Sequence, residues 1–229
     1  MRASTGKGAC LVMREVVALS STGGPTRRST RTPSGGPSAA PAGPVDLARY
    51  AAVRTLRASR STLEPQVAAH AGEMFDVLSD PAIYEFENEA PPSAAWLARR
   101  YLLLESRSSK DGAEKWLNWV IRLPSGELAG YVQATVLRSG SSYVAYVVAS
   151  RYWRCGVGGS AVQAMFEELR SAYGVHTFVA VLKAANYRSL GLLRRLGFTP
   201  ASRHQVAEYG AEPDELAMVK AVGVAQNAA

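Results

Sequence analysis

The sequence predicts a mixed α/β (α+β) fold, in which a mostly antiparallel central sheet of about six to seven strands is flanked by about four helices. Three observations predict it. Three β-rich segments follow one another with turn residues between them, a glycine-rich loop then joins a strand to a helix, and strands and helices alternate after that loop. The 229 residues, 47% apolar and 20% charged, suffice for one domain with a sizeable core and exclude a fully disordered chain.

The first 45 residues are expected to form a disordered basic tail, and residues 46–229 a single folded domain. The segment from Ser20 to Pro44 is almost entirely Ser, Thr, Gly, Pro, Ala and Arg, which cannot bury enough apolar surface to offset its ordering entropy. The tail holds six Lys and Arg residues and one Glu, so it carries +5 of the net charge of +7. Its composition also resembles a transit peptide, and nucleic-acid binding through it is an alternative. Since the folded part is close to neutral, no nucleic-acid partner is expected.

Cysteine usage and hydropathy indicate the compartment. Cys10 and Cys155 cannot make a disulfide framework, which favours a reducing environment. No apolar run approaches the roughly 18 residues of a membrane span. No His or Cys cluster has metal-ligand spacing. We therefore expect a cytoplasmic protein without membrane contact or metal.

Two helical patterns open the folded part. Apolar residues at helical spacing run from Val67 to Leu78 and stop before Asp80-Pro81, which predicts a first helix. A second helix is expected to begin at Ser93, a capping residue, and to end near the polar stretch that starts at Ser106.

The period then changes to that of strands. Turn residues at 124–127 and 138–141 separate three segments rich in Val, Ile, Trp and Tyr, which predicts an antiparallel meander. The segments are Lys115–Arg122, Leu128–Leu137 and Tyr143–Ala149.

The last third of the chain alternates between the two periods. The glycine-rich loop from Arg154 to Gly159 opens a helix whose apolar stripe ends at Gly174. The remaining expected elements are a strand over Thr177–Leu182, a short helix over Tyr187–Leu196, and weaker strands near Thr199–Val206 and over Glu215–Ala221.

The glycine loop predicts a phosphate-binding site. Backbone N–H groups at a helix N-terminus point outward, and glycines let a ligand approach them without side-chain obstruction. The alternative is that these glycines only make a tight turn. A Walker motif is absent, and the segment Gly156–Ala161 fits GxGxxA, but Lys183-Ala184-Ala185 stands where a ribose-binding acid would follow. The Walker and Rossmann interpretations are therefore both disfavoured.

The combination of the loop with a later segment is more specific. Trp153-Arg154-Cys155-Gly156-Val157-Gly158 opens a helix, and Asn186-x-x-Ser189 and Leu196-Gly197-Phe198 follow about thirty residues later. Over residues 54–221 this resembles the GNAT superfamily of acyl-CoA-dependent N-acetyltransferases. Tyr152-Trp153 and Leu78-Ser79-Asp80-Pro81 are similar to the branch with the ribosomal-protein N-terminal acetyltransferases.

The resemblance implies an acetyl-CoA site and a primary amine substrate, such as a protein N-terminus or a small-molecule amine. The loop amides would hold the pyrophosphate, and the strand before the loop would splay from its neighbour and pair with the pantetheine. Asn186 would bond the pantetheine, Ser189 would lie near the sulfur and protonate the thiolate, and an N–H near Val148 would stabilise the oxyanion. The alternative for the first two is a helix-capping Asn and a solvent-facing Ser. The implied cofactor-binding residues are Val147, Val148, Ala149, Arg154, Cys155, Gly156, Val157, Gly158, Gly159, Asn186 and Ser189.

Two departures from the family pattern concern acid and base. Leu193 stands where many members carry Tyr, and Tyr143 where related proteins often have Glu. The base is therefore open, with Glu85 and Glu87 as candidates beside Glu89, against the alternative of solvated loop acids. Direct attack in a ternary complex needs no covalent intermediate, so Cys155 has no nucleophilic role.

Central-strand side chains are candidates for lining the acceptor groove. Trp119, Gln133 and Tyr146 are named for this, although a Trp on a strand is more often part of the core. The acceptor amine itself carries no recognisable code, and a monomer or a homodimer is expected. Because the family Tyr and Glu are missing, a catalytically degenerate acyl-CoA-binding module of the same fold is the alternative to an enzyme.

Overall fold

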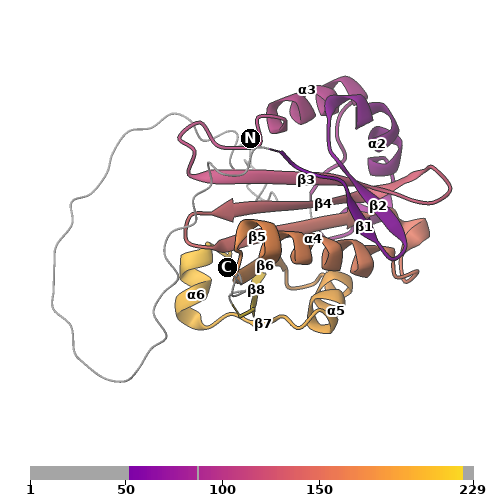
Figure 1. Cartoon of the computed structure of the whole chain (residues 1–229). Coiled ribbons are helices and arrows are strands. Elements are labelled where there is room, and N and C mark those ends of the chain that lie inside the picture. The colour runs from indigo at the N-terminus through magenta and orange to yellow at the C-terminus, as the bar shows by residue number, and fades with distance from the viewer. Residues whose placement is uncertain (1–51, 87, 224–229) are drawn as a thin grey trace, which may run out of the picture.

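Figure 1 shows the computed structural model, which describes residues 52–86 and 88–223. The tail predicted over residues 1–45 lies outside these residues. Eight strands form one sheet in the order β1-β2-β3-β4-β5-β6-β8-β7. The strands are β1 Leu56–Ala58, β2 Ser61–Pro65, β3 Glu114–Arg122, β4 Leu128–Leu137, β5 Ser141–Val148, β6 Thr177–Lys183, β7 Thr199–Pro200 and β8 Glu215–Ala221.

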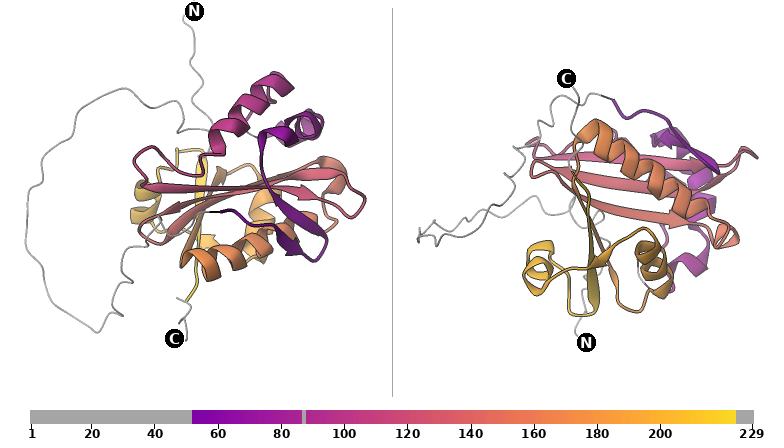
Figure 2. Two further views of the ribbon diagram at one scale, coloured as in Figure 1. Left: turned by 45° about the horizontal axis from the view of Figure 1, so that its top comes forward. Right: turned by 60° about the horizontal axis from the view of Figure 1, so that its bottom comes forward.

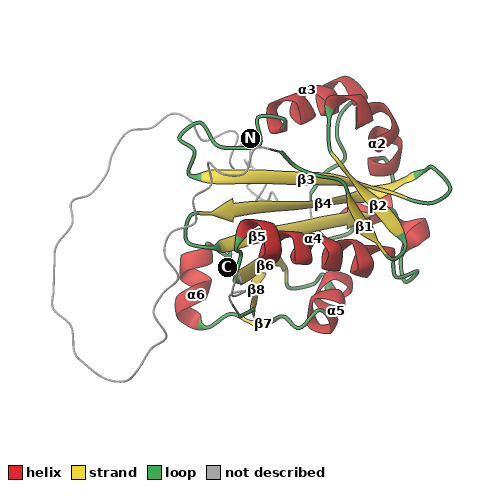
Figure 3. Ribbon diagram, viewed as in Figure 1, coloured by secondary structure: helices red, strands yellow, loops and turns green. Residues whose placement is uncertain are grey.

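The helices agree with the expected four and add one. Short 3-10 turns η2, η3 and η4 precede α2, α3 and α4 (Figure 3). The elements are η2 Ala68–His70, α2 Ala71–Leu78, η3 Pro81–Tyr84, α3 Ala94–Leu104, η4 Ser150–Tyr152, α4 Val157–Tyr173, α5 Tyr187–Arg195 and α6 Arg203–Tyr209.

Local signals explain where the helices begin and end. The Ser93 side chain accepts a hydrogen bond from the Trp96 N–H and caps α3 as predicted. Gly174, at φ +64°, closes α4, because a residue without Cβ enters the left-handed region without steric cost. Helix α6 was not predicted, because a strand was expected near Thr199–Val206. Its signals are a capping box between Ser202 and Gln205 and the stop at Gly210.

The mixed antiparallel sheet confirms the predicted fold class, with eight strands instead of six to seven. The additional strands β1 and β2 form a hairpin in which Leu56 pairs with Leu63, and β2 pairs with β3. They extend the central meander, which runs as predicted from β3 through β4 to β5. The strand expected near Thr199–Val206 shrinks to Thr199–Pro200, because the chain turns into α6.

Helices cover both faces of the sheet (Figures 1 and 2). Helices α4 and α5 bury one face, where Met165 of α4 and Leu193 of α5 join Leu117 and Val132 of the sheet. Helices α2 and α3 bury the other face around Val120. Successive strand residues point to opposite faces, so each strand contributes to both layers.

A bulge in β4 decides which β4 side chains face α2 and α3. The register shifts between Ile121 and Arg122, which pair with Gly130 and Leu128, and leaves Ala129 as the extra residue. Gly130 adopts φ +152°, and a Cβ there would lie 2.0 Å from the Val147 carbonyl oxygen. Only glycine permits this approach, which fixes β4 against β5.

Candidate active site

Strands β5 and β6 part from each other, and the opening between their backbones is called the cleft. They pair in parallel only from Ser141 to Tyr143, opposite Thr177 to Val179, although both strands continue further. The Ala149 N–H donates to the Ala129 carbonyl at 2.9 Å, so in the alternating ladder the backbone groups of Val148 face the opening cleft. The splay that the resemblance implied is therefore present.

The Val148 carbonyl is already engaged at the end of this cleft. The Trp153 indole N–H donates to it at 2.7 Å, which folds the loop after β5 back over the strand end. By the same alternation the backbone groups of Val147 face β4, whereas Ala149 donates its N–H to β4 and accepts the Tyr152 N–H at its carbonyl. Of these three candidate residues, Val148 is the one whose backbone faces the cleft.

The glycine-rich loop brings the start of α4 to the cleft. Arg154 and Gly156 both have positive φ, +60° and +77°, and the helix begins at Val157. The N–H groups of the first turn of a helix have no acceptor within it, and the helix dipole adds positive potential there. Gly158 also serves packing, since a Cβ on it would lie 3.3 Å from the Val148 side chain. The loop thus combines a turn with the amides of a helix N-terminus.

Arg60 is a candidate binding residue that the sequence analysis did not identify. It lies in the turn between β1 and β2, and its Nε would lie 2.9 Å from a Cβ placed on Gly156. Together with Arg154 it adds positive charge beside the loop amides. No local motif marks Arg60, because the contact joins segments almost a hundred residues apart.

Asn186 and Ser189 lie at the start of α5. The Asn186 side-chain oxygen accepts the Ser189 N–H at 3.0 Å and so caps the helix. Ser189 is half-buried, and its carbonyl accepts a hydrogen bond from the Tyr146 hydroxyl of β5 at 3.3 Å. Leu193 has no hydroxyl, and its side chain is buried in the core with 1% exposure. Tyr146 brings a phenol to Ser189 instead.

Arg188 ties three segments together beside the cleft. Its guanidinium lies 4.6 Å from the Trp153 ring centroid, 4.9 Å from that of Tyr187 and 5.3 Å from that of Phe86. It also pairs with the Glu85 carboxylate at 2.5 Å. Glu85, a predicted base, is therefore held in an ion pair and does not line the pocket described next. Such contacts between a cation and aromatic faces are each favourable by roughly 0.5–1 kcal/mol when exposed.

Asp80 connects the loop after α2 to the loop after β5. Its carboxylate accepts the Ala82 N–H at 3.0 Å and the Ser150 N–H at 2.8 Å. Burial raises the pKa of Asp80, but the hydrogen bonds from Ser150 and Ala82 outweigh it and hold the pKa below its usual value. The Leu78-Ser79-Asp80-Pro81 motif therefore has a structural role at the site.

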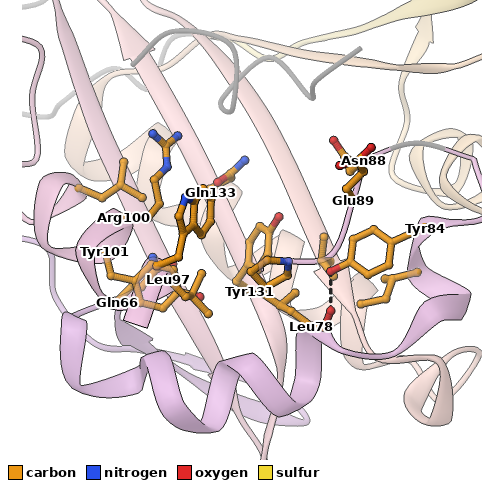
Figure 4. A pocket seen from close by; sticks show the side chains of 15 residues that line it. Gln66, Leu78, Tyr84, Asn88, Glu89, Leu97, Arg100, Tyr101, Tyr131 and Gln133 are labelled. Carbon is orange, nitrogen blue, oxygen red and sulfur yellow. Dashed lines mark hydrogen bonds between the residues drawn. The ribbon is translucent and has the colours of Figure 1, made fainter. Parts of the chain in front are cut away.

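A pocket opens between η3, α3 and the sheet face of β4 and β5 (Figure 4). The pocket is open on one side, and the space between its walls is about 710 Å³ when the open solvent at its mouth is included. Tyr84 donates to the Leu78 carbonyl at 2.6 Å, and burial raises the pKa of Tyr84 to about 12. The lining residues are Gln66, Leu78, Ile83, Tyr84, Asn88, Glu89, Pro91, Trp96, Leu97, Arg100, Tyr101, Leu104, Tyr131, Gln133 and Val147.

The predicted groove residues divide between the two faces of the sheet. Gln133 lines the pocket. Trp119 does not, because it is fully buried on the α4 face, where its indole N–H donates to the Arg54 carbonyl at 2.9 Å. Tyr146 also packs on that face and reaches α5. Glu87 lies outside the described residues, whereas Glu89 lines the pocket.

The cleft and the pocket thus meet at one strand, β5. The cleft along β5 with helix-terminal amides suits a ligand with a phosphate and an extended arm, and the pocket beside it suits a second ligand. This arrangement suits an enzyme that transfers a group between two substrates. Residues 60–199 match the model of the acetyltransferase (GNAT) domain, and the chain belongs to that family.

Solved structures share the fold at low sequence identity. The ribosomal-protein-S5-alanine acetyltransferase from Vibrio fischeri is 17% identical, with 73% of this chain and 96% of that chain covered at a TM-score of 0.61. RimL, a ribosomal L7/L12 α-N-protein acetyltransferase solved with coenzyme A, is 16% identical, with 74% and 98% covered at a TM-score of 0.59. A putative GNAT-family acetyltransferase from Bordetella pertussis is 23% identical, with 73% and 99% covered at a TM-score of 0.57. Comparison with curated proteins gives no match.

Two absences concern the residues that the structure describes. Over 52–86 and 88–223, no three His, Cys, Asp or Glu side chains gather in a way that would hold a metal ion. Within the same ranges no helix combines the length and the apolar character that crossing a membrane requires.

Proposed function

We propose that the protein transfers the acetyl group of acetyl-CoA to a primary amine by direct attack in a ternary complex. One observation carries this proposal. Adjacent residues of β5 serve the two cavities, because the Val147 side chain lines the pocket and the Val148 backbone faces the cleft. An amine in the pocket would therefore approach a thioester that lies along the cleft.

The donor side would bind acetyl-CoA through backbone and charge. The first-turn amides of α4, with Arg154 and Arg60 beside them, suit the pyrophosphate. The cleft-facing backbone of Val148 suits the pantetheine arm, and its N–H suits the developing oxyanion. Asn186 lies at the opposite wall, at the start of α5.

The chemistry needs a base and an acid. The amine nitrogen forms a bond to the thioester carbon, the carbon–sulfur bond breaks, and the amine loses a proton while the coenzyme A thiolate gains one. Glu89, which lines the pocket, is proposed to take the proton directly or through water. Ser189 is proposed to protonate the thiolate, with the Tyr146 phenol beside it.

The buried Leu193 favours one alternative, a module that binds acyl-CoA without turnover. Thiol release by the full chain, measured with acetyl-CoA and a panel of primary amines and N-terminal peptides, separates the two. Melting temperatures with acetyl-CoA, ATP and NAD test the donor site independently. Acetyl-CoA at about 100 times its Kd should add roughly 2.7 kcal/mol, a rise of several degrees. A rise without thiol release would favour the module, and no rise would contradict both.

A further inference from the structure

Arg188 of α5 joins three segments that border the cleft and the pocket. Its guanidinium contacts the ring of Trp153, in the loop after β5, at 4.6 Å, and the ring of Phe86, in the segment after η3, at 5.3 Å. It also forms an ion pair with the Glu85 carboxylate at 2.5 Å. Phe86 in turn packs edge-on against Tyr187, with ring centroids 5.6 Å apart and an interplanar angle of 82°. The segment after η3 is therefore attached to the start of α5.

The aromatic contacts make this attachment stronger than the ion pair alone would be. The side chains of Glu85 and Arg188 are 46% and 35% exposed, and an ion pair in such a position contributes little because water screens it. A planar guanidinium can stack on aromatic rings while it donates to a carboxylate, so the rings restrict its orientation. A lysine at this position would keep the charge and lose the stacking.

The attached segment leads to Glu89, the proposed base. Before the segment, the Tyr84 hydroxyl donates to the Leu78 carbonyl at 2.6 Å. After it, the Ser93 side chain caps α3. Glu89 lies between these two fixed points, three residues after Phe86, and lines the pocket. The contacts between the segment and α5 therefore help to set where the Glu89 carboxylate lies relative to the cleft.

The walls of the cleft are fixed by other contacts. The Trp153 indole N–H donates to the Val148 carbonyl, and the Asn186 side chain caps α5 through the Ser189 N–H. Neither hydrogen bond uses the Arg188 side chain. Removal of the guanidinium should therefore release the segment after η3 and leave the donor side nearly unchanged.

We propose that Arg188 is a positioning residue, which holds the Glu89 carboxylate at a fixed place beside the thioester. The inference rests on the proposed function, since it takes acetyl transfer and the role of Glu89 from it. Arg188 acts through Glu85 and Phe86, on the segment that follows them. A carboxylate takes a proton from the amine only when it, or a water that it holds, is within hydrogen-bond reach. Loss of Arg188 should therefore affect the amine side of the reaction.

Steady-state kinetics and calorimetry with the full chain test the proposal. Arg188→Ala should lower kcat/KM for the amine about tenfold, because a displaced base transfers protons poorly, and should change the Kd of acetyl-CoA less than about twofold. Arg188→Lys should recover part of the loss. Arg194→Ala, which removes an exposed arginine of the same helix, is the matched control and should change neither quantity. An unchanged kcat/KM in Arg188→Ala, or a change confined to the Kd of acetyl-CoA, would overturn the inference.

A double-mutant cycle distinguishes positioning from general support of the fold. In the Glu89→Gln background, Arg188→Ala should lower kcat/KM less than about twofold, because the place of a side chain that takes no proton no longer matters. A residue that only supports the fold would cause the same loss in both backgrounds. Equal losses in the two backgrounds would therefore contradict the inference.

Proteolysis provides a test that does not depend on turnover. An endoproteinase that cleaves after glutamate is added to the full chain, and mass spectrometry identifies the cleavage sites. Arg188→Ala should speed cleavage after Glu89 about fivefold or more, because the released segment opens more often, and Arg194→Ala should not. Equal cleavage in wild type and Arg188→Ala would contradict the inference even if acetylation proceeds. Faster cleavage in Arg188→Ala, without thiol release from the wild type, would support the attachment by Arg188 and contradict the proposed function.

Discussion

The donor cleft and the acceptor pocket differ in how the chain builds them. The cleft lies where β5 parts from β6, and two short continuous segments border it, the loop that leads into α4 and the start of α5. The pocket collects side chains from η3, α3, β4 and β5, with Gln66 from beyond β2. The first presents mainly backbone and the second mainly side chains. A site built from backbone groups depends less on the identity of its side chains than a site built from side chains does, so the two sides should respond differently to substitution.

The largest effect is expected from a substitution that blocks the donor side. Gly158→Trp should abolish both thiol release and the rise in melting temperature with acetyl-CoA, because the side chain would fill the space before the loop amides and crowd Val148. Gly72→Trp is the control, since a Cβ there meets nothing within 4 Å. Circular dichroism establishes that each variant is folded. Acetyl-CoA stabilisation retained in a folded Gly158→Trp protein would remove the loop from the donor site.

The next effect tests the acceptor side. Glu89→Gln should lower kcat/KM about 100-fold and remove the acidic limb of its pH profile, because a neutral amide cannot take a proton. Glu85→Gln should have a smaller effect, since Glu85 is engaged with Arg188. Steady-state rates from pH 5 to 10 check both. An equal fall of kcat/KM in both variants would contradict a base at Glu89 and would assign the effect to the loop that holds the Glu85–Arg188 ion pair.

The two hydroxyls between the sites can be compared directly. Ser189→Ala should lower kcat about tenfold with KM for acetyl-CoA unchanged, a modest effect because a thiolate leaves readily. Tyr146→Phe keeps the ring and loses the bond to the Ser189 carbonyl. If it lowers kcat more than Ser189→Ala does, the phenol is the acid.

A smaller effect concerns charge at the donor side. Arg60→Gln should raise KM for acetyl-CoA about fivefold at low ionic strength and less at high salt, because exposed charges are screened. Arg57→Gln, in the neighbouring strand β1, is the control. A change that is insensitive to salt would indicate a packing role for Arg60 against Gly156.

The smallest effect concerns the link between the two sides. Asp80→Asn should destabilise the fold by about 1 kcal/mol, because one of two N–H groups loses its carboxylate partner. Since the pKa of Asp80 is lowered in the folded protein, its contribution is present above the unfolded pKa, near 4, and is lost as the pH falls through the lowered value. Denaturant melts at pH 7 and pH 3 check this, and the difference between variant and wild type should shrink at the lower pH.

The local elements around the proposed donor side were largely predictable because their signals lie within a few residues. The glycine loop, the capping Asn186 and the helix stop at Gly174 each act within a few residues. Arg60 was not predicted because its position depends on the β1–β2 hairpin. The first strand of this hairpin has three residues, which are too few to show an alternating pattern. Helix α6 was missed although its capping box and Gly210 are visible in the sequence.

The acceptor side was less predictable because strand alternation does not say which face is which. Trp119 and Gln133 were both named for the groove, yet they point to opposite faces. The extra residue at Ala129 changes the phase of β4, and no pattern around it announces a bulge. Pairing between distant segments decides these positions.

The division of β5 between the two cavities has a consequence for how this sequence can evolve. Inserting or deleting one residue within β5 would exchange the orientations of Val147 and Val148. The side chain that lines the pocket would then point to the opposite face, and the backbone groups that face the cleft would face β4. Gly130, whose contact with the Val147 carbonyl admits no side chain, holds the register. Length changes should therefore be excluded from Ser141–Val148, and they should be tolerated in the turn at 124–126, which lies between β3 and β4 and away from Glu89.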